Sequence, residues 1–406
     1  MNNWKSLHIS DLGRIITGKT PKTSIKENYG GNIPFLTPSD DLSNKYAPDT
    51  NKKITELGLN EVKNCLLPPN SICVSCIGSD LGKVVMLKEY SVTNQQFNSI
   101  IPYEDFYPDF IYYLMTIVGK ELNFIGKTST AVPIINKSTF SKTEVVIPSL
   151  PTQQKIANIL SSLDDKIEVN RRINEQLEEL AQALFKSWFV DFEPFKDGEF
   201  VESELGMIPK GWKVTKLDEV CSYISRGLTP KYDNDSDEII LGQTCVRNNI
   251  VTLNNGRKHR PKKKNEKWIQ QWDVLINSTG VGSLGRVGVV YFDKDNVAID
   301  SHITVVRPIS SLYKHYIGRT LLSKQAEIEN MAIGSTGQTE LPKDSIKSML
   351  ILLPIDDILV LFNKSIEPIC KLMYSNLEEI THLSNLRDTL LPKLMSGEID
   401  INEVEI

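Results

Sequence analysis

The chain contains one long pattern twice, and this duplication constrains its fold more than any other feature. "WKSLHISDLGRIITGKTPK" (Trp4–Lys22) resembles "WKVTKLDEVCSYISRGLTPK" (Trp212–Lys231). "SICVSCIGSDLGKVVML" (Ser71–Leu87) resembles "DVLINSTGVGSLGRVGVV" (Asp273–Val290). The spacing of roughly 208 residues is far longer than a solenoid repeat of about 20–50 residues. The sequence therefore predicts two copies of a whole domain.

Two further matches complete the duplication. "NQQFNSIIP" (Asn94–Pro102) resembles "DSHITVVRP" (Asp300–Pro308), and "IGKTSTAVPII" (Ile125–Ile135) resembles "IGSTGQTEL" (Ile333–Leu341). Each copy then closes on an apolar strand and a proline, "VVIP" or "ILLP". Alternating β-branched residues around glycine turns predict strands, so each copy is expected to be rich in β-structure.

A long helical segment follows each copy. Its apolar residues alternate three and four apart for about five heptads, which is typical of a coiled coil. The first set is Leu160, Leu163, Ile167, Leu177, Ala181, Leu184 and Trp188, with Asn170 and Asn174 in the gaps. The second set is Leu359, Phe362, Ile366, Ile369, Met373, Ile380, Leu383, Leu390 and Leu394, with Asn376 and Arg387 in the gaps.

These two helices are expected to bury each other. About 38 residues span roughly 57 Å, too long for one stripe to pack on a domain of this size. Buried asparagines would fix the register. Two independent surface helices are the alternative. Pro368 predicts a kink or a late start of the second helix.

The expected layout alternates globular and helical parts. It comprises a first β-rich domain at 1–150, a helix at 151–190, a linker at 191–208, a second β-rich domain at 209–354, a helix at 355–396 and a tail at 397–406. This is an α+β fold.

Bulk composition limits the class of protein. The formal net charge is -5, so any nucleic-acid contact must come from local basic clusters. Arg257–Lys267 is such a cluster, although a solvated loop is the alternative. Six cysteines are too few for a disulfide framework. With no secretory leader and no long apolar run, a reducing cytoplasm is the expected compartment.

"GRIITGKT" (Gly13–Thr20) matches the phosphate-binding pattern G-x-x-x-x-G-K-[ST]. A phosphate loop must join a strand to a helix, but no helical period follows here. The second copy has Cys221 and Leu228 at the aligned Gly13 and Lys19 positions. The shared unit is therefore a G-x-T-P-K turn, and an NTPase is disfavoured.

Other catalytic patterns are also weak. Cys73 and Cys76 have no second ligand pair at zinc spacing, so core cysteines are expected. The five histidines form no metal or triad pattern, and no methyltransferase tetrapeptide occurs. The absence of a catalytic constellation favours a non-catalytic binding module, which binds no cofactor and no metal.

The repeated turns present amide, hydroxyl and basic side chains, which suit base edges and phosphates. Ordinary polar loops are the alternative. The candidate DNA-binding residues are Thr20, Lys22, Lys83, Asn94, Gln95, Gln96, Lys127, Thr128 and Ser129 in the first copy, and Thr229, Lys231, Arg257, Lys258, Arg260, Lys262, Lys263, Arg286, Ser301, His302, Ser335, Thr336 and Gln338 in the second.

The whole chain resembles the specificity (S) subunit of type I restriction–modification systems. The resemblance is strongest in "LPTQQKIANILSSLDDKIEVNRRINEQLEELAQALFKSWFVDFEP" and the following "ESELGMIPKGW". The G-x-T-P turns, "IGSTGQ" and the C-terminal "LRDTLLPKLMSGEI" are similarly typical. It implies two target recognition domains related by pseudo-two-fold symmetry, separated by a long antiparallel coiled coil.

The resemblance also implies a function. Each recognition domain would read half of an interrupted DNA target. The two half-sites would lie about 35–50 Å apart. The helices would dock two methyltransferase (M) subunits, which carry S-adenosylmethionine and methylate a flipped adenine. Restriction (R) subunits, which use ATP and Mg, would join this core. The expected coiled-coil and M-subunit interface residues are Leu163, Ile167, Leu177, Leu184, Trp188, Phe189, Ile369, Met373, Ile380, Leu383, Leu390 and Leu394.

Two alternatives stay open. One is an S-like subunit of another bipartite restriction system, such as type IIB. The other, from a different class, is a coiled-coil scaffold that carries two ligand-binding β domains.

Overall fold

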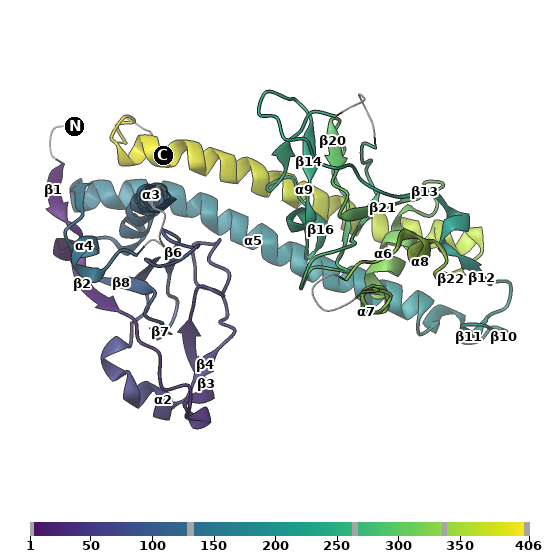
Figure 1. Ribbon diagram of the computed structural model, residues 1–406, viewed down its shortest axis with the longest axis horizontal. Helices are drawn as coiled ribbons and strands as arrows, with labels where there is room; N and C mark the ends of the chain where they lie inside the picture. Colours follow the sequence, from purple (N-terminus) through teal and green to yellow (C-terminus); the bar gives the residue numbers. More distant parts are fainter. Residues whose placement is uncertain (1–3, 128–133, 262–266, 335–338, 402–406) are drawn as a thin grey trace. The chain divides into compact units, whose positions relative to one another are not determined.

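A computed structural model describes residues 4–127, 134–261, 267–334 and 339–401. The chain divides into two compact units: unit 1 comprises residues 1–169 and 379–406, and unit 2 comprises residues 170–378. Each unit contains one β-rich domain and a part of both long helices, α5 (Leu150–Phe189) and α9 (Asp356–Met395), as Figure 1 shows. Each helix is therefore shared between the units.

The two β domains have similar but not identical orders of elements. The first contains β1 (Lys5–His8), α1 (Ile9–Leu12), β2 (Gly13–Thr17), η1 (Lys26–Asn28), β3 (Tyr29–Leu36), β4 (Lys53–Ile54), α2 (Glu56–Glu61), η2 (Lys63–Cys65), β5 (Ile72–Ser75), β6 (Val84–Met86), β7 (Val92–Thr93), β8 (Phe97–Pro102), α3 (Pro108–Lys127), α4 (Lys137–Ser141) and β9 (Glu144–Ile147). The second contains β12 (Lys213–Lys216), η4 (Leu217–Val220), β13 (Cys221–Arg226), β14 (Ile239–Leu241), η5 (Gln243–Cys245), β15 (Val246–Arg247), β16 (Asn249–Val251), β17 (Arg257–Lys258), β18 (Val274–Asn277), β19 (Val287–Val289), β20 (Val297–Ile299), β21 (Ile303–Pro308), α6 (Lys314–Ser323), α7 (Gln325–Asn330), α8 (Lys343–Lys347) and β22 (Leu350–Leu353).

The three sheets of the first domain each have a counterpart in the second. The first has the orders β2-β8-β5-β6, β4-β3-β7 and β1-β9, and the second has β13-β21-β18-β19-β16-β15, β17-β14-β20 and β12-β22. The parallel pair of β3 with β7 in the first domain recurs as β14 with β20. The second domain adds β15 and β16 at one edge. The predicted duplication of an α+β domain is confirmed.

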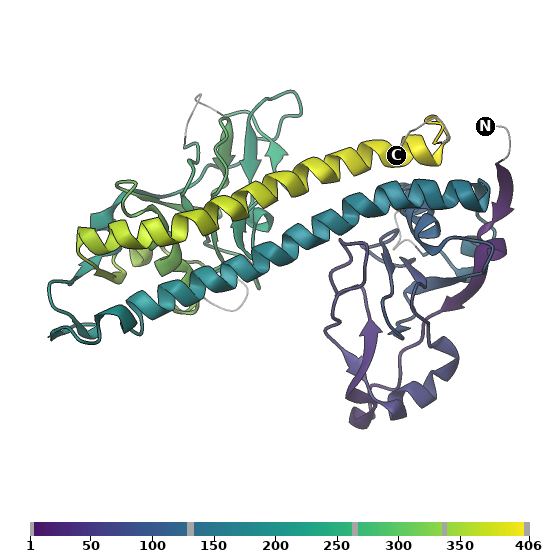
Figure 2. The same cartoon turned by 180° about the vertical axis from the view of Figure 1, so that it is seen from behind.

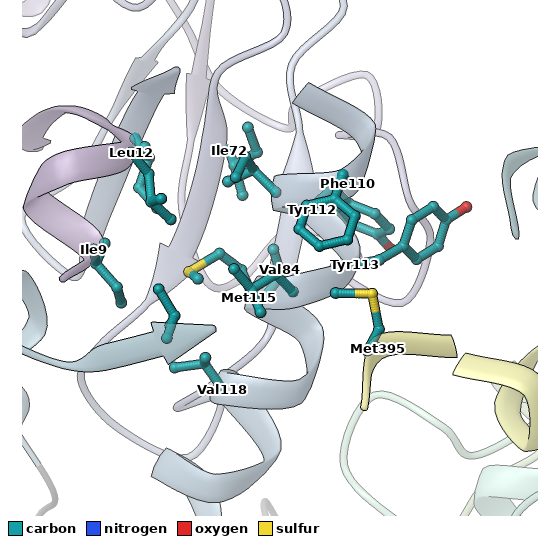
Figure 3. Packing of buried hydrophobic residues seen from close by; sticks show 14 of the residues in the cluster. Ile9, Leu12, Ile72, Val84, Phe110, Tyr112, Tyr113, Met115, Val118 and Met395 are labelled. Atoms are coloured by element: carbon teal, nitrogen blue, oxygen red, sulfur yellow. The ribbon is translucent and has the colours of Figure 1, made fainter. Parts of the chain in front are cut away.

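The core of unit 1 joins the first β domain to both long helices. Helix α3 buries Phe110, Tyr113 and Met115 among strand residues such as Ile72. Met395, at the end of α9, belongs to the same cluster, and Figure 3 shows it beside Tyr113. A long helix on this domain thus buries part of its apolar stripe against the domain as well as against its partner helix.

In each unit the α5 and α9 segments lie side by side and run antiparallel, as seen in Figure 2. In unit 1, Asp164 pairs with Arg387 while Lys166 pairs with Glu379. In unit 2, Asn376 donates from Nδ2 to Asn174 Oδ1 at 2.8 Å, and Asn174 donates to the Met373 carbonyl at 3.1 Å. The expected helix pairing is confirmed, and two of the asparagines that were expected to fix the register contact each other.

A buried charge network ties each β domain to the helix pair. In unit 1, Asp164 accepts from Tyr113 Oη of α3 and from Arg387 of α9, both at 2.6 Å. In unit 2, Arg319 of α6 donates to both carboxylate oxygens of Glu178 on α5 at 2.7 Å. Because an unpaired buried charge is costly, these networks define how each domain sits on its own helix segments.

Two expectations about the helical parts need correction. Helix α9 begins at Asp356 and continues through Pro368, so the expected late start is wrong. Pro368 lies at an exposed position, away from the packed stripe. The expected linker at 191–208 is also folded: it contains η3 (Glu193–Phe195), and β10 (Phe200–Ser203) pairs with β11 (Gly206–Pro209) as a hairpin. Phe192 and Phe195 pack on Trp212.

Among the described residues, no helix has the length and apolar character needed to cross a bilayer.

The buried His315 of α6 predicts an acid-sensitive stability. Burial, with Lys314 acting in the same direction, lowers the pKa of His315 to about 3 from its ordinary 6.5. The unfolded chain takes up this proton near pH 6.5, whereas the native protein does not. Stability should therefore fall as pH drops from about 6.5 towards 3, by up to about 1.4 kcal/mol per pH unit from this group.

Urea unfolding of wild type and His315→Gln at pH 7, 6, 5 and 4 measures this effect. We expect a shallower loss of unfolding free energy in the variant. The exposed His382 provides the control, because His382→Gln should keep the wild-type slope. Equal slopes for wild type and His315→Gln would contradict the prediction.

Candidate nucleic-acid interface

The G-x-T-P-K turn makes the same backbone contacts in both β domains. The N–H of Gly18 donates to the Phe97 carbonyl, and that of Gly227 donates to the Ile303 carbonyl, each at 3.1 Å. The next N–H groups follow the same pattern. That of Lys19 donates to the Thr93 carbonyl at 2.9 Å, and that of Leu228 donates to the Ile299 carbonyl at 2.8 Å. The turn is thereby attached to the segment that joins β7 to β8, or β20 to β21.

Close backbone approach explains the glycine of this turn. A Cβ on Gly18 would lie 2.1 Å from the Asn94 carbonyl oxygen, and one on Gly227 would lie 2.1 Å from that of Ile299. No side chain fits at such distances. Gly18 therefore serves packing, and the turn is not a phosphate loop: Gly13–Thr17 is strand β2, and η1 begins only at Lys26.

The segment facing that glycine is itself a matched turn. Asn94 Oδ1 accepts from the Gln96 N–H at 3.0 Å, and Asp300 Oδ1 accepts from the His302 N–H at 2.8 Å. Burial raises the pKa of Asp300, and the His302 N–H bond opposes that rise. Asn94 also donates to Gln96 Oε1 at 2.8 Å. Asn94 and Asp300 thus shape the turns.

Two more segments join the turns in each domain. The N–H of Cys76 donates to the Gln96 carbonyl at 2.7 Å, and that of Ser278 donates to the His302 carbonyl at 2.8 Å. The N–H of Ile135 donates to the Cys76 carbonyl at 2.9 Å, and that of Leu341 donates to the Ser278 carbonyl at 2.8 Å. We call the four segments of each domain its turn cluster. They are 18–22, 76–83, 94–96 and 134–135 in the first domain, and 227–231, 278–286, 300–302 and 339–341 in the second.

The turn cluster brings together the nominated residues of the first domain. Thr20 Oγ1 donates to Gln95 Oε1 at 2.7 Å, so the turn and the facing segment also meet through side chains. Lys83 forms an ion pair with Asp80 at 2.9 Å. The side chains of Lys22, Lys83 and Gln95 are exposed, whereas that of Asn94 is buried.

In the second domain the nominated residues meet at the equivalent place. The Lys231 N–H donates to His259 Nδ1 at 2.9 Å, which fixes the turn against the basic cluster. Arg286 donates to the Gly282 carbonyl at 2.6 Å. Thr229, Lys231 and His302 are exposed, and Ser301 is partly exposed.

The basic cluster is anchored on a strand rather than being a wholly solvated loop. Arg257 and Lys258 are the exposed residues of edge strand β17. Arg257 lies over the Tyr232 ring at 5.0 Å, and Arg260 pairs with Asp233 at 2.7 Å. This edge offers cations to a polyanion, although Arg260 is already neutralised.

Several predicted site residues lie outside the described residues. They are Thr128, Ser129, Lys262, Lys263, Ser335, Thr336 and Gln338, together with the side chain of Lys127, the last residue of α3.

Sequence reasoning missed two residues of the second domain. Gln243 donates from Nε2 to Thr279 Oγ1 at 3.0 Å, and that hydroxyl lies 2.9 Å from His302 Nδ1. Thr279 stands where the first copy has Ile77. That apolar-to-polar difference in an otherwise matched strand end was the available signal.

The predicted interface residues of the helices face the packed side. Ile167, Phe189, Met373 and Leu394 are buried. The others are partly buried: Leu163, Leu177, Leu184, Trp188, Ile369, Ile380, Leu383 and Leu390. They serve helix packing first. Sequence reasoning missed the buried Phe185, which contacts Tyr316 and Phe362.

Neither metal nor thiol chemistry has support in this part of the molecule. No cluster of three His, Cys, Asp or Glu side chains suited to a metal occurs in the described ranges. Burial raises the pKa of Cys73 to about 12 and that of Cys76 to about 11, so both thiols stay protonated core residues, as predicted.

Comparisons with known proteins agree with this duplicated architecture. The family profile described as "Type I restriction modification DNA specificity domain" matches residues 1–179 and 209–371. The MjaIX specificity subunit of a type I restriction enzyme from Methanocaldococcus jannaschii is 31% identical, over 99% of this chain and 95% of that protein. The HindI specificity subunit from Haemophilus influenzae is 25% identical, over 98% of this chain and 100% of that protein.

A solved structure supports the fold. The type I restriction–modification S subunit from M. genitalium has a TM-score of 0.57 at 17% identity, covering 97% of this chain and 96% of that one. The class of protein is thus one that has two similar β-rich domains and two long helices. The chain belongs to the specificity-subunit family of type I restriction–modification systems.

The turn glycine predicts a large effect of a single methyl group. Gly18→Ala should destabilise the protein by about 2–4 kcal/mol, because the Asn94 carbonyl must move. Lys19→Ala in the same turn keeps the backbone N–H bond and should change the free energy of unfolding by less than about 0.5 kcal/mol. Urea unfolding of both variants provides the test. Similar stability of Gly18→Ala and Lys19→Ala would show that the turn is not constrained by this contact.

Proposed function

We propose that each β domain reads one half of a bipartite, interrupted DNA target through its turn cluster. The observation that carries this proposal is a matched backbone frame with unmatched side chains. The Gly18, Cys76 and Gln96 contacts recur at Gly227, Ser278 and His302. A constant frame with variable polar side chains is suited to reading two different half-sites.

Local charge supports DNA as the ligand despite the net charge of -5. Lys22 and Lys83 in the first domain, and Lys231, Arg257 and Lys258 in the second, are exposed at or beside the turn clusters. Lysine and arginine neutralise phosphates, whereas amides and hydroxyls at the turns provide donors and acceptors for base edges. The two types of group lie together in each domain.

The helix pair would hold methyltransferase (M) subunits, through which restriction (R) subunits join. Exposed apolar residues on the outer faces of α5 and α9 support a docking role: Val169, Leu180, Leu372 and Leu386. S-adenosylmethionine would be held by the M subunits, and ATP and Mg by the R subunits. The chain itself would supply recognition and no catalytic residue, in the cytoplasm where the cell's DNA lies.

The proposal predicts a bipartite preference. The full chain, coexpressed with its methyltransferase partner, is incubated with a random duplex library, and the retained sequences are determined. We expect two short conserved blocks separated by a fixed unspecified gap. Retention of random duplex without any preferred sequence would contradict DNA recognition and favour a scaffold role.

The helix pair yields a separate prediction. Leu177→Glu with Leu383→Glu places charge on the packed side of α5 and α9, so co-purification of the methyltransferase partner should fall at least about 10-fold. Ala183→Glu, at an exposed position of α5 outside the proposed docking residues, controls for added charge without disturbing helix packing. Unchanged co-purification of the double variant would show that partner docking does not depend on this packing.

A further inference from the structure

Three polar side chains of the second β domain form one hydrogen-bonded group, which we call the polar triad: Gln243, Thr279 and His302. Gln243 donates to the Thr279 carbonyl and, at 3.0 Å, to Thr279 Oγ1. Thr279 Oγ1 lies 2.9 Å from Nδ1 of His302, whose side chain is exposed. An amide, a hydroxyl and an imidazole from three separate segments are thus linked at the turn cluster.

The backbone beneath the polar triad is held in place. Asn277 donates from Nδ2 to the Gln243 carbonyl at 3.2 Å. The Ser278 N–H donates to the His302 carbonyl, and the Leu284 N–H donates to the Gly280 carbonyl at 3.0 Å. Side chains fixed in this way lose little conformational freedom on binding, which favours specificity.

The first β domain has the same frame with different side chains. The carbonyls of Leu36 and Leu241 accept from the N–H groups of Asn94 and Asp300, each at 3.0 Å. Two residues after these leucines stand Pro38 in the first domain and Gln243 in the second. By the same alignment, Ile77 and Gln96 correspond to Thr279 and His302.

The first domain therefore lacks the elements of the triad: proline and isoleucine have no side-chain hydrogen-bonding groups. The polar triad is a property of the second domain alone, built on a frame that both domains share. Such a difference is expected where two domains must read different sequences.

We propose that the polar triad reads one base pair of the half-site bound by the second domain, through its major-groove edge. This inference rests on the proposed function. The proposal takes the tautomer in which Thr279 Oγ1 donates to His302 Nδ1 and the ring proton is on Nε2. In that tautomer the triad offers an acceptor, Gln243 Oε1, and a donor, His302 Nε2–H.

This pair of groups matches the chemistry of the major groove. Adenine presents an amino group beside the N7 acceptor, and a G·C pair presents the cytosine amino group beside guanine O6. In the minor groove only a G·C pair offers a donor to Gln243 Oε1, so a reader there would separate G·C from A·T and no more. The proposal assigns the triad to the major groove because only that groove distinguishes all four base pairs.

Gly280 offers a way to disturb the triad without removing any of its members. A Cβ on Gly280 would lie 3.0 Å from both Nε2 and Oε1 of Gln243 and 2.5 Å from Ser283 Oγ. The residue also has φ +96°, which a side chain disfavours. Gly280→Ala should therefore displace the Gln243 amide.

Selection from a random duplex library by the full chain with its methyltransferase partner tests the inference. Gln243→Ala and His302→Ala should each reduce discrimination at one position of the second half-site by roughly 10-fold, because each removes one bond of a two-bond base contact. Gly280→Ala should relax the same position. Gln96→Ala, at the aligned position of the first domain, should leave the second half-site unchanged.

A combined exchange keeps the test independent of simple loss of folding. Thr279→Ile with His302→Gln gives the second domain two of the three residues of the first and should change the preferred base at that position. If these variants keep every wild-type preference, the triad does not read a base. Equal weakening on all sequences would assign it to phosphate contact and also overturn the inference. A wild-type complex with no bipartite preference would instead contradict the proposed function itself.

Discussion

The recognition end of each β domain depends on one close backbone contact. The turn glycines Gly18 and Gly227 each lie so near a carbonyl oxygen of the facing segment that a Cβ would be 2.1 Å away. The carbonyl of Gln96 or His302 in that facing segment accepts a hydrogen bond from the loop that follows β5 or β18. A carbonyl of that loop in turn accepts from Ile135 or Leu341. The contact allows polar side chains to vary on a backbone that stays constant, which is what a family of sequence readers requires.

The two long helices also provide the surface to which each β domain is attached. In unit 1 a carboxylate of α5 accepts from a tyrosine of the domain and an arginine of α9, and in unit 2 a carboxylate of α5 accepts two bonds from a domain arginine. Apolar packing supplies most of the stabilisation, whereas these buried charges favour one orientation, because a shifted domain would leave a charge unpaired.

The sequence predicted the duplicated α+β domains, both long helices and the asparagines between them, because periodic or repeated patterns indicate these features. It did not predict Phe185, which lies one position off the heptad stripe, because it packs on Tyr316 of a domain distant in sequence. The continuous course of α9 through Pro368 also depends on tertiary packing that outweighs helix propensity. Gln243 and Thr279 were missed because their significance lies in a contact between segments 36 residues apart.

The central claim is that the two β domains read DNA independently on one shared frame. The most direct measurement is a genome-wide map of methylated adenines in cells carrying the methyltransferase partner and the chain with residues 1–150 exchanged for another recognition domain. We expect a bipartite motif in which one half changes and the other half is retained. A change in both halves, or methylation without a bipartite motif, would contradict it.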